Sequence, residues 1–105
     1  MAVSGRPLNT ALEGMNDHHR LAEKLEGVLA GTMDILALLD DALSYGEPMK
    51  HCYHGLWHYQ SDADIRAKDP AYRSMQDSEM RKLIDLLRTE APGSKLSRVS
   101  FLGVS

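Results

Sequence analysis

The sequence predicts an all-α protein, a small helical bundle or helical hairpin with a long N-terminal helix, a middle helix, a C-terminal helix and an extended C-terminal tail. Apolar residues recur at helical spacing across residues 10–45, and two further segments begin with the start signals of helices. The chain of 105 residues is 43% hydrophobic and 26% charged, which is ordinary for globular proteins. We therefore expect residues 1–105 to form a single domain.

The first expected helix is preceded by a short arm. Gly5 opposes regular structure, and we expect residues 1–9 to be flexible. Thr10 and Glu13 fit a capping box, in which each side chain satisfies one backbone N–H of the first turn. A glycine and a proline follow residue 45, so we expect the helix to cover residues 10–45.

A helix over residues 10–45 would be about 54 Å long, whereas a compact domain of this size is roughly 33 Å across. Either the helix breaks at Gly27 or Gly31, or part of its apolar stripe faces a partner. The stripe keeps its phase through both glycines, so we expect an unbroken helix. The expected interface combines the stripe with two apolar residues of the tail: Leu21, Leu25, Val28, Leu29, Ile35, Leu36, Leu39, Leu43, Val99 and Phe101.

Two shorter helices are expected next. Pro48 can occupy the first turn of a helix over residues 48–68, and a further cap signal at Ser61 predicts a kink near that residue. Asp69 precedes a proline, so a third helix should cover residues 70–90. The middle helix is expected to turn one apolar face toward the core, formed by Met49, Cys52, Tyr53, Leu56 and Ala63.

The last segment, residues 94–105, has a different pattern. Val99 and Phe101 alternate with Arg98 and Ser100, as in an extended chain. Two interpretations stay open. The segment is a loose tail, or it is an arm that packs across a neighbouring subunit or adds to the edge of a partner's sheet.

Histidines recur along the middle helix. His51, His54, His58 and Asp62 lie at i, i+3, i+7 and i+11, which places them on one face of a continuous helix. His54 and His58 could hold a divalent metal ion such as zinc, with His51 or Asp62 as third ligand. The competing interpretation is a polar surface or interface, because this face points away from the expected core. The alternative function is accordingly a divalent-metal or heme-binding sensor.

Charge is unevenly distributed although the net charge is only −3. Residues 1–65 carry 4 basic and 10 acidic side chains, and residues 66–105 carry 8 basic and 5 acidic ones. Nucleic-acid binding through the basic C-terminal half is therefore a lower alternative, since the first half repels phosphate. The sequence shows no signal peptide or membrane-spanning segment, and with a single cysteine we expect a cytoplasmic protein without membrane contact.

The leading prediction is a non-catalytic protein–protein interaction module that acts as a small regulator, inhibitor or adaptor through its long helix. The chain lacks a glycine-rich phosphate loop, a nucleophile elbow and a paired-cysteine motif, so we do not expect an enzyme. Cys52 is expected to be a buried thiol. No cofactor is expected in this interpretation, and the partner is a second copy of the chain or a larger protein complex.

Overall fold

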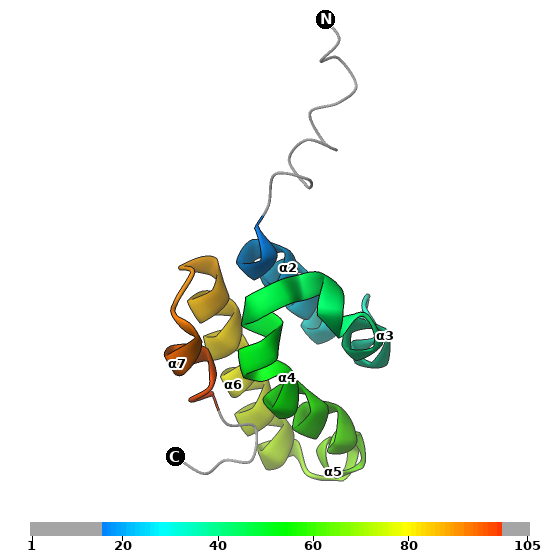
Figure 1. The fold of residues 1–105 in the computed structure, drawn as a ribbon. Coiled ribbons are helices and arrows are strands. Elements are labelled where there is room, and N and C mark those ends of the chain that lie inside the picture. The colour runs from blue at the N-terminus through cyan, green and yellow to red at the C-terminus, as the bar shows by residue number, and fades with distance from the viewer. Residues whose placement is uncertain (1–15, 100–105) are drawn as a thin grey trace, which may run out of the picture.

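The computed structural model describes residues 16–99, and this part of the chain is helical without strands. The predicted all-α class and small bundle are confirmed (Figure 1). Three of the helices are long, and short helices connect or follow them. The elements in chain order are α2 (Asp17–Ala30), α3 (Ile35–Asp40), the 3-10 helix η1 (Ala42–Tyr45), α4 (Gly46–Ser61), α5 (Ala63–Lys68), α6 (Pro70–Arg88) and α7 (Gly93–Leu96).

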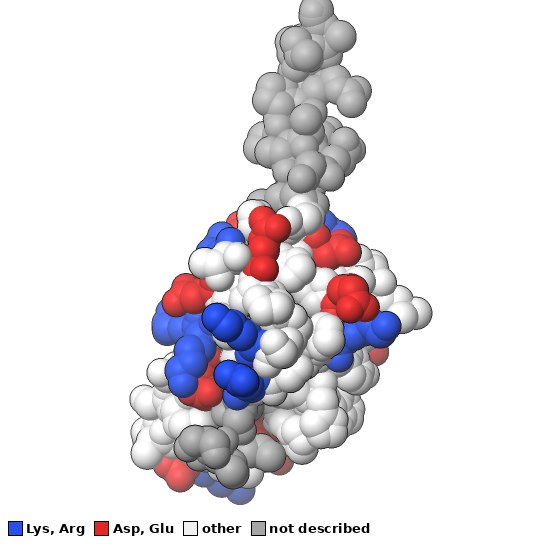
Figure 2. All heavy atoms as spheres, turned by 60° about the vertical axis from the view of Figure 1, so that its left-hand side comes forward, with Lys and Arg blue, Asp and Glu red and all other residues white. Residues whose placement is uncertain are grey.

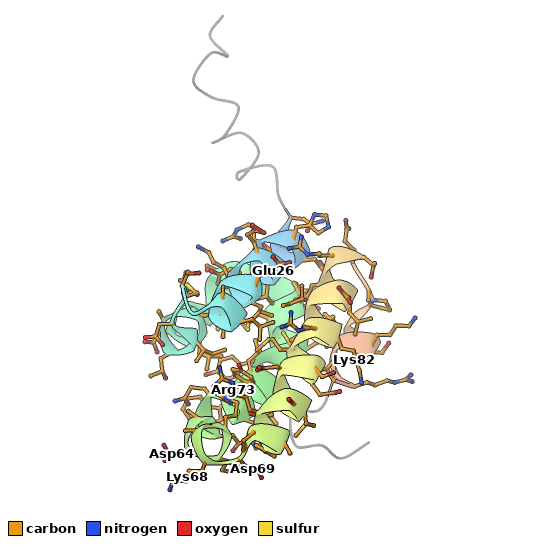
Figure 3. The ribbon with its side chains drawn as sticks, turned by 180° about the vertical axis from the view of Figure 1, so that it is seen from behind. Glu26, Asp64, Lys68, Asp69, Arg73 and Lys82 are labelled. Atoms are coloured by element: carbon orange, nitrogen blue, oxygen red, sulfur yellow. The ribbon has the colours of Figure 1, made fainter. Side chains whose placement is uncertain are left out.

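Helices α2 and α6 pack along each other and, with α4, enclose the core (Figure 1). Arg88 near the end of α6 pairs with Glu26 and Glu23 of α2, and His19 Nε2 lies 3.1 Å from the Arg88 carbonyl oxygen. Glu26 lies on the α2 side of this contact in Figure 3. Within residues 16–99, the fully buried large apolar side chains of the core are Leu21, Leu25, Leu38, Met49, Leu56, Met80, Leu83, Leu87 and Leu96.

The expected unbroken helix is wrong within the described residues, because α2 ends at Ala30. Gly31 adopts a left-handed conformation with φ of 83°, and its N–H donates to the carbonyls of Gly27 and Val28. Asp34 then caps α3 by accepting from the Leu36 N–H. This four-residue turn redirects the chain so that α3 packs on α4. The predicted arm, Thr10 and Glu13 lie outside the described residues.

The middle segment is divided as predicted. Helix α4 ends at Ser61 and α5 begins at Ala63, so the expected kink near Ser61 is confirmed as a break at Asp62. The predicted core face of the middle helix is wrong at two residues. Tyr53 is exposed, and Ala63 is exposed at the start of α5; Tyr59 is buried instead. The inner face of α4 is formed by four buried residues that follow one another at intervals of three, four and three positions: Met49, Cys52, Leu56 and Tyr59.

A buried polar network closes the corner between α5 and α6. Gln76 is fully buried; its Nε2 donates to Asp62 Oδ2 at 2.9 Å and its Oε1 accepts from Arg66 Nη1 at 2.7 Å. The Tyr72 hydroxyl also donates to Asp62, at 2.7 Å. Arg66 lies over the Tyr59 ring, 3.8 Å from its centroid. These contacts hold α5 at the start of α6.

Helix α6 starts as predicted, with Asp69 accepting from the N–H groups of Ala71 and Tyr72 and proline at the first turn. The prediction of an extended tail is wrong over the part of the tail that the structure describes, because residues 93–96 form the short helix α7. Leu96 and Val99 pack into the core, and this burial replaces the extended chain that alternation suggested. None of the helices in residues 16–99 is long and apolar enough to cross a membrane.

Candidate functional site

The structure brings together two of the four predicted metal ligands. His54 and His58 lie on successive turns of α4, with their Nε2 atoms 3.1 Å apart and their rings nearly perpendicular. His54 is exposed and His58 is half-buried. The pair presents two ring nitrogens at one point of the surface, and it can share a proton or hold one cation.

The other two predicted ligands have different contacts. His51 Nε2 lies 3.4 Å from Glu47 Oε2, and its ring packs against Gly93 of α7, where a Cβ atom would collide with it. Asp62 accepts from residues of α6 in the buried network. Within residues 16–99, no group of three or more His, Cys, Asp and Glu is arranged to hold a metal ion. Of the four residues predicted to share one ligand-binding face, only His54 and His58 therefore have their ring nitrogens together.

Cys52 is buried on the inner face of α4, as predicted. Its Sγ donates to the Pro48 carbonyl oxygen at 3.2 Å. Burial raises the pKa of the Cys52 thiol to about 12, because the thiolate would lose its hydration. At neutral pH the residue is a protonated, inaccessible thiol, which suits neither a nucleophile nor a metal ligand.

Most of the residues that were predicted to face a partner lie instead in the core of the chain itself or against it, so the prediction is wrong for them. Leu21, Leu25, Leu39 and Val99 are buried, and the partly buried members pack against the same core. The break at Gly31 produces this outcome by folding α3 back onto α4. Phe101 lies outside the described residues. The partly buried members are Val28, Leu29 and Ile35.

Two members of the stripe stay on the surface. Leu43 is 99% exposed and Leu36 is 45% exposed. Leu43 borders a groove of about 760 Å³ between the α3–η1 segment and α4. We call this hollow the α3–α4 groove. Its walls are formed by Leu39, Asp40, Ala42, Leu43, Gly46, Glu47, Met49, Lys50 and Tyr53.

Aromatic side chains extend the apolar surface of the α3–α4 groove along α4. Tyr53 lines the groove, and Trp57 follows one turn later on the same side of the helix. The two side chains are 41% and 45% exposed. Sequence reasoning assigned Tyr53 to the core. The signal it missed is the i, i+4 spacing of two aromatic residues on one side of α4.

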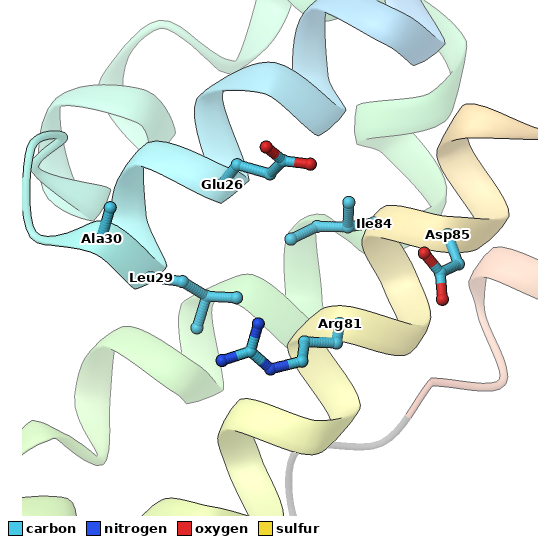
Figure 4. A pocket seen from close by; sticks show the side chains of 6 residues that line it. All are labelled: Glu26, Leu29, Ala30, Arg81, Ile84 and Asp85. Atoms are coloured by element: carbon cyan, nitrogen blue, oxygen red, sulfur yellow. The ribbon is translucent and has the colours of Figure 1, made fainter.

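A second hollow, of about 470 Å³, lies between α2 and α6 (Figure 4). Half of its lining is charged, and one of these side chains, Glu26, already pairs with Arg88. Its lining residues are Glu26, Leu29, Ala30, Arg81, Ile84 and Asp85. It is therefore smaller and more polar in composition than the α3–α4 groove.

Charged side chains elsewhere are largely mixed. Lys and Arg gather on the side of α6 and α7 in Figure 2, with Asp and Glu among them. On α6, Lys82 pairs with Glu79 at 2.7 Å and Arg73 lies 3.8 Å from Asp77; Arg73 and Lys82 are seen along this helix in Figure 3.

Comparison of the chain with models of protein families, with curated proteins and with solved structures gave no match.

Proposed function

We propose that this protein is a non-catalytic helical binding module whose α3–α4 groove receives an apolar segment of another protein. The observation that carries the proposal is the position of Leu43, fully exposed beside a hollow with apolar walls. Full burial of a leucine side chain is worth about 1.5–3 kcal/mol. A partner that covers Leu43 would gain this free energy.

The surroundings of Leu43 support the same proposal. Isolated exposed apolar residues are common, but four of the five large exposed ones within residues 16–99 border the groove or lie one helical turn from it. Two of the four are tyrosine and tryptophan, the residue types most enriched at the energetic centres of protein interfaces. These four are Leu36, Leu43, Tyr53 and Trp57.

The test uses a designed amphipathic helix as the probe and Trp57, the single tryptophan of the chain, as the reporter. Addition of the helix should change Trp57 fluorescence in a saturable manner. Leu43→Asp should weaken binding by about tenfold or more, because a carboxylate then has to be desolvated at the contact. Folding of the variant is checked by circular dichroism and urea unfolding.

Ile65 supplies the matched control. It is 46% exposed on α5 and does not line the groove. Ile65→Asp introduces the same charge at another exposed apolar residue and should leave binding unchanged. Equal loss of binding in both variants would contradict the groove as the docking site, and so would a helix that leaves Trp57 fluorescence unaffected.

A second candidate function is a divalent-cation site at the His54–His58 pair. Two nitrogens bound to one zinc ion at 2.0–2.1 Å in tetrahedral geometry are about 3.3 Å apart, and the observed Nε2–Nε2 distance is 3.1 Å. Because both rings approach from one side of α4, the pair suits a cation better than the two opposite faces of a heme.

Calorimetric titration with Zn²⁺ tests this second candidate. Alanine at His54 or His58 should abolish binding, whereas His51→Ala should leave it intact, because His51 contacts Glu47 and Gly93 instead. Absence of heat in the wild-type titration, or equal loss in all three variants, would refute the site.

A further inference from the structure

Carboxylates outnumber cations among the residues that line the α3–α4 groove and in the segment from which most of them come. Residues 34–47 hold four carboxylates and neither Lys nor Arg. Two of the four accept hydrogen bonds from neutral donors: Asp34 from the Leu36 N–H, and Asp41 from the Ser44 hydroxyl at 2.8 Å. Asp40 lines the groove and forms no ion pair within residues 16–99. None of these three carboxylates forms an ion pair in the part of the chain that the structure describes.

The cations close to the groove already have their own carboxylates. Lys50 Nζ lies 3.4 Å from Glu47 Oε1, and this contact lowers the pKa of Glu47. Arg20 Nη1 lies 2.9 Å from Asp17, whose side chain abuts Gly46, and the guanidinium lies over the Tyr45 ring. Neither cation is free to neutralise the carboxylates of residues 34–41. The rim of the groove is therefore acidic overall.

The walls of the groove favour a helix as the occupant. An extended peptide gains affinity by pairing with an exposed sheet edge, and residues 16–99 contain no strand. An amphipathic helix instead places apolar side chains at i, i+3 and i+4 into a groove of this kind. Residues that flank the apolar face of this helix would then lie beside Asp40 on one wall and near Tyr53 and Trp57 on the other. A carboxylate attracts a cation by its charge, and an aromatic ring attracts one by a cation–π contact.

We infer that the occupant of the α3–α4 groove is a cationic amphipathic helix, an inference that rests on the proposed binding function of the groove. The apolar face of this helix covers Leu43 and Tyr53. Its Lys and Arg residues face the acidic rim at Asp40 and the adjacent Asp41. The rim charges select the partner and accelerate its association, and the apolar contact supplies most of the affinity.

The experiment compares two designed helices that share one apolar face and differ in their polar face, which is Lys/Arg in one and Glu in the other. Trp57 fluorescence reports binding at about 50 mM and about 300 mM salt. The cationic helix should bind about tenfold more tightly at low salt, with a smaller difference at high salt. Double substitution Asp40→Asn and Asp41→Asn, which leaves the Lys50–Glu47 pair in place, should reduce this preference about threefold or more.

The matched control removes two carboxylates elsewhere, by Asp64→Asn on α5 and Asp85→Asn on α6, and should leave the preference unchanged. If both helices bind equally and Leu43→Asp abolishes both complexes, the groove binds helices without charge selection, and the cationic partner is refuted while the binding function stands. If neither helix binds, both fail. Self-association of the wild type in sedimentation analysis that Leu43→Asp abolishes would identify a second copy as the occupant and overturn the inference.

Discussion

The two halves of the first apolar stripe have the same periodicity but different environments. In α2, Leu21 and Leu25 are fully buried because α6 and α4 both pack on this helix. In the α3–η1 segment, Leu39 is buried, whereas Leu43 is almost fully exposed. A helix enclosed on two sides buries a wide stripe, and one covered on a single side leaves part of it on the surface. The proposed binding surface is this uncovered part.

The largest expected effect is in the α2 half. Leu25→Ala should lower the free energy of unfolding by about 2–5 kcal/mol, because it removes a fully buried side chain and leaves a cavity between packed helices. Urea denaturation followed by circular dichroism measures the change. A loss below about 1 kcal/mol would show that α2 is less tightly enclosed than the structure indicates.

A smaller effect is expected at the α5–α6 corner, which is closed by polar rather than apolar contacts. Gln76→Leu should cost about 1–3 kcal/mol, because Asp62 and Arg66 each lose a hydrogen-bond partner while the volume is nearly kept. Gln76→Glu serves as a second variant that keeps the acceptor for Arg66 and brings a carboxylate close to Asp62. Stability equal to the wild type in both variants would mean that the network does not hold this corner.

The turn between the two halves should respond to Gly31→Ala by a loss of about 1–2 kcal/mol. Gly31 has φ of 83°, and a Cβ atom there would meet open space, so the cost comes from the backbone conformation alone. Gly31→Asn, which tolerates this conformation better, should recover part of the loss. An alanine variant as stable as the wild type would indicate that the chain continues as helix through residue 31.

The smallest effect is expected at Leu43, in the exposed half. Leu43→Ala should change the free energy of unfolding by less than about 0.5 kcal/mol, since no neighbour covers the side chain. The comparison with Leu25→Ala uses the same substitution in both halves of the stripe. Destabilisation above about 1.5 kcal/mol would show that Leu43 is covered in solution, either by its own chain or by a second copy.

Local signals in the sequence predicted several boundaries well. Asp69 and the following proline mark the start of α6, and the cap signal at Ser61 lies one residue from the break at Asp62. These features succeed because a capping side chain and a proline act on backbone groups within three residues of themselves. They need no knowledge of the rest of the fold.

The break after α2 also had a local signal, which the periodic stripe concealed. Gly31 followed three residues later by Asp34 is a C-terminal cap followed by an N-terminal cap. The apolar residues keep a helical phase across the turn, but the buried side does not follow it: Leu38, which lies off the stripe, is fully buried, and Leu36 of the stripe is exposed. Periodicity therefore reports neither that an element is continuous nor which side a neighbouring helix covers.

The histidine pattern shows the same limit. The spacing of His54 and His58 on successive turns of α4 was sufficient to predict their proximity. His51 and Asp62 fit the pattern equally well, but α7 and α6 provide contacts that the pattern on α4 cannot reveal. Neighbouring helices thus decide which members of a helical face are available for a ligand.

By itself, the sequence determined the all-α class, the caps that open α6 and divide α4 from α5, and the pairing of His54 with His58. Only the tertiary structure decided that most of the leucine stripe is internal, that Tyr53 faces outward, and that Leu43 adjoins an acidic, apolar groove. The physical reason is that helix formation and capping depend on residues a few positions apart. Exposure depends on which distant helix covers a side chain, and no neighbouring helix covers Leu43 in residues 16–99.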